Sequence, residues 1–112
     1  MRAIKIDATN RTVSTIDFEG NFEAIQREIN VEIFTCVGLN GDGDTLYVDD
    51  EGLYKSDDFF MIEGFDQPLA GNGLILGTDE DGESVGTDMK LPNVQFLSRL
   101  DIAVMSRAGA FD

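Results

Sequence analysis

Residues 38–53 constrain the fold more than any other stretch, because they join a strong turn signal to a short strand pattern. Residues 40–43 read Asn-Gly-Asp-Gly, in which glycine accepts a positive φ and Asn and Asp can hydrogen-bond to their own backbone. Leu46 and Val48 then alternate with polar neighbours, which is the period of a half-buried strand. Together with the apolar run at residues 31–37, this pattern predicts a β-hairpin.

The same stretch partly matches a calcium-binding loop of the EF-hand type. Asn40, Asp42, Asp44 and Glu51 fall at the first, third, fifth and last positions of such a loop. The sixth position, which needs Gly, holds Thr45, and the flanking residues are typical of strands where an EF-hand needs helices. The hairpin is therefore favoured, and we expect no metal and no cofactor. A metal-binding module at residues 40–51 is kept as an alternative.

The rest of the chain alternates strand patterns with turns. Strands are expected near residues 3–7, 13–18, 31–37, 45–49, 59–62 and 74–78. The mostly apolar run 31–37 predicts a central strand with both faces covered. Asn21 is a good N-cap for an amphipathic helix over residues 22–29. Pro92 and the spacing of Val94, Leu97 and Leu100 predict a second short helix, while residues 101–105 fit a strand or a continued helix equally well.

These elements predict an α+β domain of two layers, in which a mostly antiparallel sheet of about five or six strands carries one or two short helices on one face. The length of 112 residues fits one domain. We expect a single globular domain over residues 1–105 and a loose C-terminal tail over residues 106–112. Cys36 is the only cysteine, which excludes an internal disulfide framework, and we expect it to be buried in its apolar strand.

Net charge is the strongest signal in the composition. The chain carries −14, and residues 31–90 hold fifteen acidic residues against only Lys55 and Lys90. Such a field repels nucleic acid and anionic membranes and attracts basic proteins. Solubility or adaptation to a salt-rich host would give the same composition, and the two interpretations stay open. No apolar run has the length of a membrane span and no secretory signal pattern is present, so we expect a cytoplasmic protein without membrane contact.

The residues for common chemistry are missing from the sequence. There is no histidine, and Cys36 therefore has no imidazole partner to activate it. No glycine-rich pattern ending in Lys-Ser or Lys-Thr is present to bind phosphate. We therefore expect no enzymatic activity and no catalytic residues. The eight basic residues form no run, which argues against direct nucleic-acid binding.

Residues 63–73 form the longest stretch without a clear period, and loops of this length are often functional. Phe65 and Leu69 are expected to fix this loop to the body of the domain. An alternative function is a small-molecule or signal-nucleotide binder that uses the loop as a lid. The ligand would then contact Phe65, Gln67, Gly71 and Asn72.

A further expectation comes from the order of the elements as a whole. The strand pattern at residues 3–7, the helix pattern at 22–29 and the runs at 43–53, 59–62 and 68–79 occur together in this order. In this combination the chain resembles a family of small acidic domains of unknown function that are found in phages, plasmids and integrative elements. The resemblance extends over roughly residues 1–90 and brings no established catalytic residues with it.

The resemblance implies an origin in a mobile element. Small acidic proteins in that setting often bind and inhibit host defence components, some of them by imitating the charge of DNA. We therefore expect a non-enzymatic protein in the host cytoplasm whose acidic surface docks and inhibits a basic, nucleic-acid-binding host protein. The sequence does not define its oligomeric state. The expected docking surface comprises Asp42, Asp44, Asp49, Asp50, Glu51, Asp79, Glu80, Asp81 and Glu83.

Overall fold

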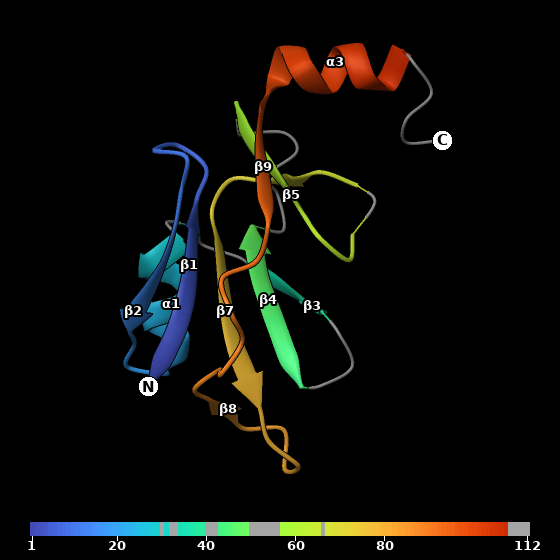
Figure 1. Cartoon of the computed structure of the whole chain (residues 1–112). Helices are drawn as coiled ribbons and strands as arrows, with labels where there is room; N and C mark the ends of the chain where they lie inside the picture. Colours follow the sequence, from blue (N-terminus) through green and yellow to red (C-terminus); the bar gives the residue numbers. More distant parts are fainter. Residues whose placement is uncertain (30, 32–33, 40–42, 50–56, 66, 108–112) are drawn as a thin grey trace.

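The computed structural model describes residues 1–29, 31, 34–39, 43–49, 57–65 and 67–107. Nine strands and two helices lie within these residues (Figure 1). In chain order they are β1 (Arg2–Asp7), β2 (Thr12–Asp17), α1 (Phe22–Ile29), β3 (Phe34–Gly38), β4 (Asp44–Asp49), β5 (Asp58–Ile62), β6 (Leu69–Ala70), β7 (Gly73–Thr78), β8 (Ser84–Val85), β9 (Val94–Ser98) and α3 (Arg99–Arg107).

The larger sheet has six strands, and its central strand β7 pairs with three of the others. The order is β2-β1-β7-β4-β3, and β8 also pairs with β7. Every pairing is antiparallel, including β1 with β2 and β3 with β4. The β3–β4 pairing confirms the hairpin that the turn signal at residues 40–43 predicts. Strand β7 has paired strands along both of its edges, and its side chains are almost completely buried between the layers on its two faces.

Helix α1 covers one face of this sheet. It begins after Asn21, whose side-chain oxygen accepts a hydrogen bond from the Ala24 N–H at 2.8 Å, as expected for an N-cap. Ile25 and Ile29 on its apolar stripe pack with Leu74 and Leu76 of β7. On the same side, Lys5 of β1 forms an ion pair of 2.9 Å with Glu28 of the helix.

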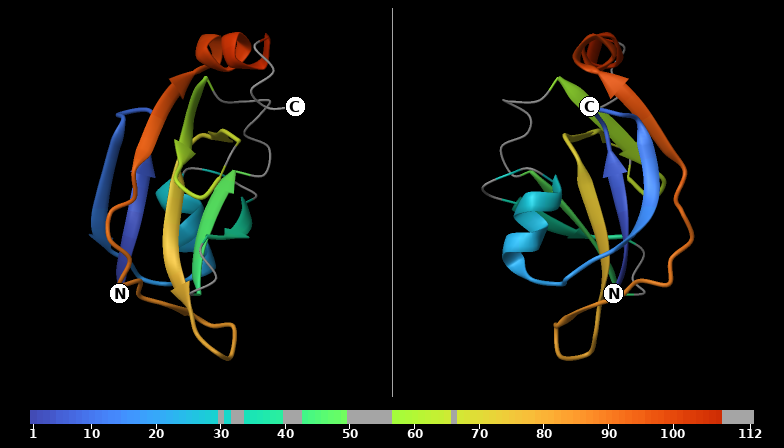
Figure 2. Two further views of the ribbon diagram at one scale, coloured as in Figure 1. Left: turned by 45° about the vertical axis from the view of Figure 1, so that its right-hand side comes forward. Right: turned by 90° about the vertical axis from the view of Figure 1, so that its left-hand side faces the viewer.

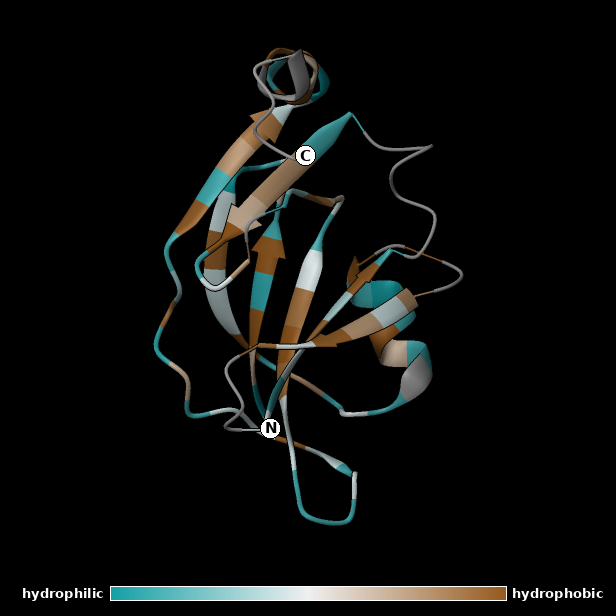
Figure 3. Cartoon of the chain, turned by 90° about the vertical axis from the view of Figure 1, so that its right-hand side faces the viewer, coloured by the Kyte–Doolittle hydropathy of each residue, from teal (hydrophilic) through white to brown (hydrophobic). Residues whose placement is uncertain are grey.

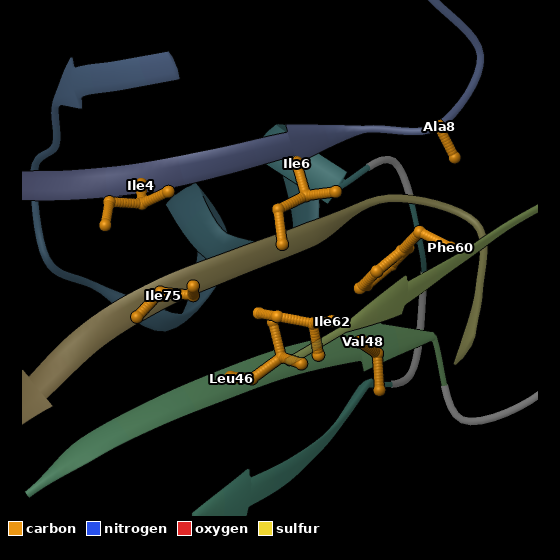
Figure 4. Close-up of a cluster of buried hydrophobic side chains, with 8 residues drawn as sticks. All are labelled: Ile4, Ile6, Ala8, Leu46, Val48, Phe60, Ile62 and Ile75. Carbon is orange, nitrogen blue, oxygen red and sulfur yellow. The ribbon is translucent and has the colours of Figure 1, made fainter. Parts of the chain in front are cut away.

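A second sheet covers the opposite face. It has three antiparallel strands in the order β6-β5-β9. Phe60 and Ile62 of β5 pack with Ile4 and Ile75 of the larger sheet, and Figure 4 shows these side chains converging between the two sheets. In Figure 2 α1 and β9 accordingly lie on opposite sides of the larger sheet.

The structure confirms a mostly antiparallel sheet with two short helices, but the three-stranded sheet was not predicted. The residues expected to start a second helix instead form β9, where Phe96 pairs with Phe60 and Leu97 with Phe59. The spacing of Val94, Leu97 and Leu100 suited a helix as well as a strand. Pairing with β5 decides between them, because it buries Leu97 while Leu100 remains 74% exposed.

The position of β3 also differs from the prediction. A central strand with two covered faces was expected at residues 31–37, but β3 is the last strand at one edge of the sheet. Thr35 and Cys36 are exposed, so Cys36 is not the buried residue that its apolar neighbours suggested. Phe34 and Val37 are only partly buried. An apolar run therefore marked a strand correctly but did not reveal how many of its faces are covered.

Helix α3 occupies residues 99–107, which resolves the ambiguity at residues 101–105 in favour of a helix. Its first turn carries a reciprocal cap. The Ser98 N–H donates to Asp101 Oδ2 at 2.8 Å, and the Asp101 N–H donates to Ser98 Oγ at 3.2 Å. Ile102 packs on Phe59 and Leu97 of the small sheet. The helix continues through Arg107, two residues into the expected tail, and residues 108–112 lie outside the described residues.

Substitution Phe60→Ala tests the contact between the two sheets. Phe60 is completely buried, so its loss should lower the free energy of unfolding by about 3–5 kcal/mol. The exposed Leu100 provides a matched control, because Leu100→Ala should change stability by less than about 0.5 kcal/mol. Urea unfolding measures both values. Equal effects of the two substitutions would contradict the packing of β5 on the larger sheet.

Acid titration tests the cap of α3. Hydrogen bonds from the Ser98 N–H and hydroxyl, helped by the charge of Arg11, hold the pKa of Asp101 below its ordinary value of 3.8. Because the folded pKa is the lower one, the cap stabilises α3 fully above pH 3.8 and is lost as the pH falls below that value through the folded pKa. The amide resonance of Ser98 should follow this step by NMR. A midpoint at or above 3.8 would contradict the cap, and Asp101→Asn should abolish the step.

Candidate functional site

The acidic residue at the start of β4 lies beside the end of β7. Asp44 is opposite Gly77 in the β4–β7 ladder. The register is held by a hydrogen bond of 2.6 Å from the Thr78 N–H to the Gly43 carbonyl, and by a contact of 2.9 Å between the hydroxyls of Thr45 and Thr78. Antiparallel pairing thus brings Asp44 to the end of the sheet from which the acidic β7–β8 turn projects.

The β7–β8 turn presents its acidic side chains to solvent. One carboxylate oxygen of Asp79 accepts hydrogen bonds from the N–H groups of Asp81 and Glu83, both at 2.9 Å, so Asp79 also organises the turn. Gly82 has a φ of 82°, which glycine adopts without strain. Glu80, Asp81 and Glu83 are exposed, and Figure 3 shows this turn as a hydrophilic tip of the molecule.

Residues 86–93, here called the strap, pass from β8 to β9 and run past the N-terminal end of β1. Thr87 is only 2% exposed, and its hydroxyl donates to an oxygen of Asp44 at 2.6 Å and accepts from the Met89 N–H at 3.1 Å. The Arg2 guanidinium donates to the carbonyl oxygens of Thr87 and Met89 at 2.8 and 2.7 Å. The strap is therefore fixed to both β1 and β4.

A pocket of about 380 Å³ lies where β4, β7, β8 and the strap meet. Asp44 and Asp88 are its acidic lining residues, and Thr78 and Thr87 contribute polar atoms. Asp88 was not in the predicted surface, because nothing in the sequence shows that the strap returns to the start of β4. We call the following six residues the acidic end: Asp44, Asp79, Glu80, Asp81, Glu83 and Asp88.

Two basic residues moderate the charge of the acidic end. Arg2 reaches the strap through the two carbonyl contacts described above, and Lys90 lies on the strap itself. Six carboxylates against these two cations leave an excess of negative charge at this end of the sheet. Helix α3, with Arg99 and Asp101, lies at the opposite end of the molecule (Figure 1).

The structure divides the surface that the sequence predicted. Asp44 and the acidic residues of the β7–β8 turn come together, but Asp49 is at the other end of β4, opposite Phe34. Five residue steps along a strand separate Asp44 from Asp49 by about 17 Å. Asp42, Asp50 and Glu51 lie outside the described residues. Asp44 and Asp49 are close in the sequence, but they lie at opposite ends of one strand.

The alternative metal loop at residues 40–51 is not supported by the part that the structure describes. Asp44 to Asp49 form the extended strand β4, and the backbone of Leu46 is paired with Ile75. A calcium loop instead needs a tight turn at these positions, so that its ligands converge. Within the described residues, no three acidic or cysteine side chains are grouped so that they could hold a metal ion. Asn40 and Glu51, the two ends of the loop, lie outside those residues.

The residues of the alternative ligand loop, at positions 63–73, have different roles in the structure. Asn72 accepts a hydrogen bond of 2.9 Å from the Ala8 N–H, and the Gly71 N–H donates to the Asp58 carbonyl at 2.9 Å, so both hold the loop in place. Gln67 is exposed. Phe65 and Leu69 pack against the core, as expected, and Phe65 also lines a pocket of about 330 Å³ with Ile62 and Asn93. The stretch also contains β6, so it is not a structureless loop.

Comparison with known proteins places the chain in a family. It belongs to the family described as a domain of unknown function (DUF3846), whose model matches residues 1–99. This confirms the expected membership in a family of uncharacterised domains, and α3 lies almost entirely beyond the matched range. No curated protein and no solved structure gives a significant match to the chain.

Two further findings concern expectations from the sequence. Neither α1 nor α3, the helices in the described part of the chain, is long and apolar enough to cross a bilayer. Cys36 is exposed at the edge of the larger sheet.

Substitution Thr87→Val tests how the strap is attached. The change keeps the shape but removes the hydroxyl between Asp44 and Met89, so stability should fall by about 1–3 kcal/mol. Thr35→Val on the exposed edge strand is the matched control and should cost less than about 0.5 kcal/mol. Thermal and urea unfolding provide the measurement. If Thr87→Val left the free energy of unfolding unchanged, the attachment of the strap would not depend on this hydroxyl.

Proposed function

We propose that this chain is a non-enzymatic binding protein of phage or mobile-element origin that docks a basic, nucleic-acid-binding host protein through its acidic end and inhibits it. The observation that carries the proposal is that six acidic residues, from β4, the β7–β8 turn and the strap, lie at one end of the larger sheet. The mobile-element origin and the cytoplasmic location rest on the resemblance of the whole chain to small acidic domains of such elements.

Charge complementarity gives this interaction its physical basis. A one-signed acidic patch steers a basic partner into encounter and makes association fast and dependent on salt. A protein that binds nucleic acid already presents Lys and Arg side chains arranged for phosphates. Carboxylates on a firm scaffold can occupy those positions in place of phosphates, which is how imitation of DNA would inhibit the partner.

The scaffold suits such a role because two of the six carboxylates are held in place by hydrogen bonds. Asp44 is held by Thr87, and Asp79 is held by two backbone N–H groups of its own turn. Ordering fewer side chains on binding lowers the entropic cost of association. The sequence contains no histidine and only the exposed Cys36 as a thiol, which supports binding over catalysis.

A pull-down from nuclease-treated host lysate tests the proposal. One variant, called the turn variant, carries Glu80→Gln, Asp81→Asn and Glu83→Gln in the β7–β8 turn. The control variant carries Glu19→Gln, Glu23→Gln and Glu63→Gln, three exposed acids outside the acidic end, and so has the same net charge. The wild type and the control should retain the same basic, nucleic-acid-binding proteins and release them as salt rises. The turn variant should retain at least about tenfold less of these proteins than the wild type does.

Two outcomes would count against the proposal. If the turn variant and the control variant retained equal amounts of basic proteins, only total charge would matter, and no docking surface would lie at the acidic end. An eluate from the wild type without basic proteins would remove the proposed partner class altogether.

A second candidate is the small-molecule or signal-nucleotide binder of the sequence analysis. The pocket beside Phe65 favours it, but the lining includes Glu63 and no basic residue among those described, which does not suit an anionic nucleotide. Thermal unfolding at low salt distinguishes the two functions. A nucleotide or other small ligand that raises the melting temperature without a protein partner would favour the second candidate.

A further inference from the structure

We infer that the outer edge of β2 is an interface through which two copies of this chain pair into one continuous sheet. The inference goes beyond the proposed function, because it makes no use of the acidic end. β2 is the last strand on one side of the larger sheet, and β1 is its only partner among the described strands. In Figure 1 β2 is accordingly the outermost strand on the side of the N-terminus.

The hydrogen bonds between β1 and β2 fix which backbone groups point outward. The Met1 amino group donates to the Phe18 carbonyl at 2.9 Å, and the Phe18 N–H donates to the Met1 carbonyl at 2.8 Å, so these two residues are a hydrogen-bonded pair. Along an antiparallel ladder, hydrogen-bonded pairs alternate with non-hydrogen-bonded pairs. Because the register is unbroken, Val13, Thr15 and Asp17 belong to the non-hydrogen-bonded pairs, and their N–H and C=O groups point away from β1.

The strand lacks the common features that prevent edge strands from pairing. Those features include Lys or Pro on the strand and a β-bulge that twists the edge away. The sequence of β2 is Thr-Val-Ser-Thr-Ile-Asp, and its register with β1 has no bulge over the six paired residues. No hydrogen bond in the described part of the chain reaches the outward backbone groups of Val13, Thr15 or Asp17. These groups are therefore available to a second strand.

A two-fold axis at Thr15 satisfies all of these groups at once. In antiparallel pairing centred there, Thr15 exchanges both hydrogen bonds with its equivalent, and Val13 exchanges both with Asp17 of the second copy. Two threonines directly opposite each other are a favourable cross-strand pair. Arg11 precedes β2 and Glu19 follows it, so the same pairing brings opposite charges together at both ends of the contact. The strand is therefore complementary to itself.

The distribution of charge favours a second copy over a basic protein at this edge. Residues 1–30 carry four basic and five acidic side chains, and ion pairs join the Met1 amino group to Asp17 at 3.0 Å and Arg27 to Glu19 at 3.4 Å. A basic partner gains little at such a balanced surface, whereas two copies can meet there without strong repulsion. Because the paired strands run in opposite directions, the two acidic ends lie at opposite ends of the joint sheet.

Sedimentation velocity over a range of protein concentrations tests the interface. A single pair of strands is a small contact, so the wild type should form dimers reversibly as its concentration rises. Thr15→Lys places two ammonium groups opposite each other and should weaken dimerisation about fivefold. Thr35→Lys makes the same change in charge on the exposed edge strand β3 and should leave the dimer as it was. Circular dichroism melting verifies that each variant is folded.

Amide hydrogen exchange measured by NMR tests the register. The amides of Val13, Thr15 and Asp17 should exchange about fivefold more slowly at high than at low protein concentration, because the second copy accepts their hydrogen bonds. The amides of Ser14 and Ile16 already donate to β1, so their exchange should not depend on concentration. Equal changes at all five amides would contradict pairing through the outer edge of β2.

Salt separates this inference from the proposed function. Screening should strengthen a dimer of two acidic chains, whereas it weakens the docking of a basic partner. A wild type that stays monomeric at high concentration and moderate salt would overturn the interface, and so would equal effects of Thr15→Lys and Thr35→Lys on dimerisation. The proposed function would survive either result, because it is tested by the retention of basic host proteins and not by the oligomeric state.

Discussion

The structure depends on the burial of strand β7 on both of its faces. Leu74 and Leu76 point toward α1, and Ile75 points toward β5 of the second sheet. Gly73 permits this close packing, because a Cβ there would lie 3.0 Å from both Leu46 and Phe60. Burying apolar surface on two sides of one strand is a large favourable term in folding and joins the helix and both sheets into one structure. The acidic end exists because β7 leaves this core and turns into β8.

The two ends of the larger sheet have different characters as a result. Toward β5 and β9 the chain forms a third apolar cluster of Phe59, Ala70 and Leu97, to which α3 adds Ile102. At the other end, β7 continues into an exposed acidic turn and the strap closes over the start of β4. Of the six acidic residues only Asp44 belongs to a paired strand, but hydrogen bonds to Asp79 and from Arg2 hold the turn and the strap that carry the others. A binding surface made this way needs little reorganisation when a partner arrives.

Local signals predicted the elements near β7 well. Alternating apolar residues marked β1 and β4, a run of four apolar residues marked β5, and Asn21 marked the start of α1. What the sequence did not reveal depends on long-range pairing. The apolar residues of β3 gave no sign that it would end the sheet, and those of β9 fitted a helix until β5 paired with it. For the same reason Asp88 was missed, and the sequence did not show that Asp44 and Asp49 lie at opposite ends of one strand, since only the topology decides which strand ends meet.

The most direct test of the docking surface is a map of where a basic ligand touches the protein. Amide NMR spectra recorded during titration with an oligo-arginine peptide, at low and at moderate salt, provide that map residue by residue. The account predicts that the largest shifts that persist at moderate salt fall on residues 43–45 and 77–89. Shifts of equal size around Glu23 and Asp57, two exposed acids away from the acidic end, would contradict it. They would show that the peptide responds only to the total charge of −14.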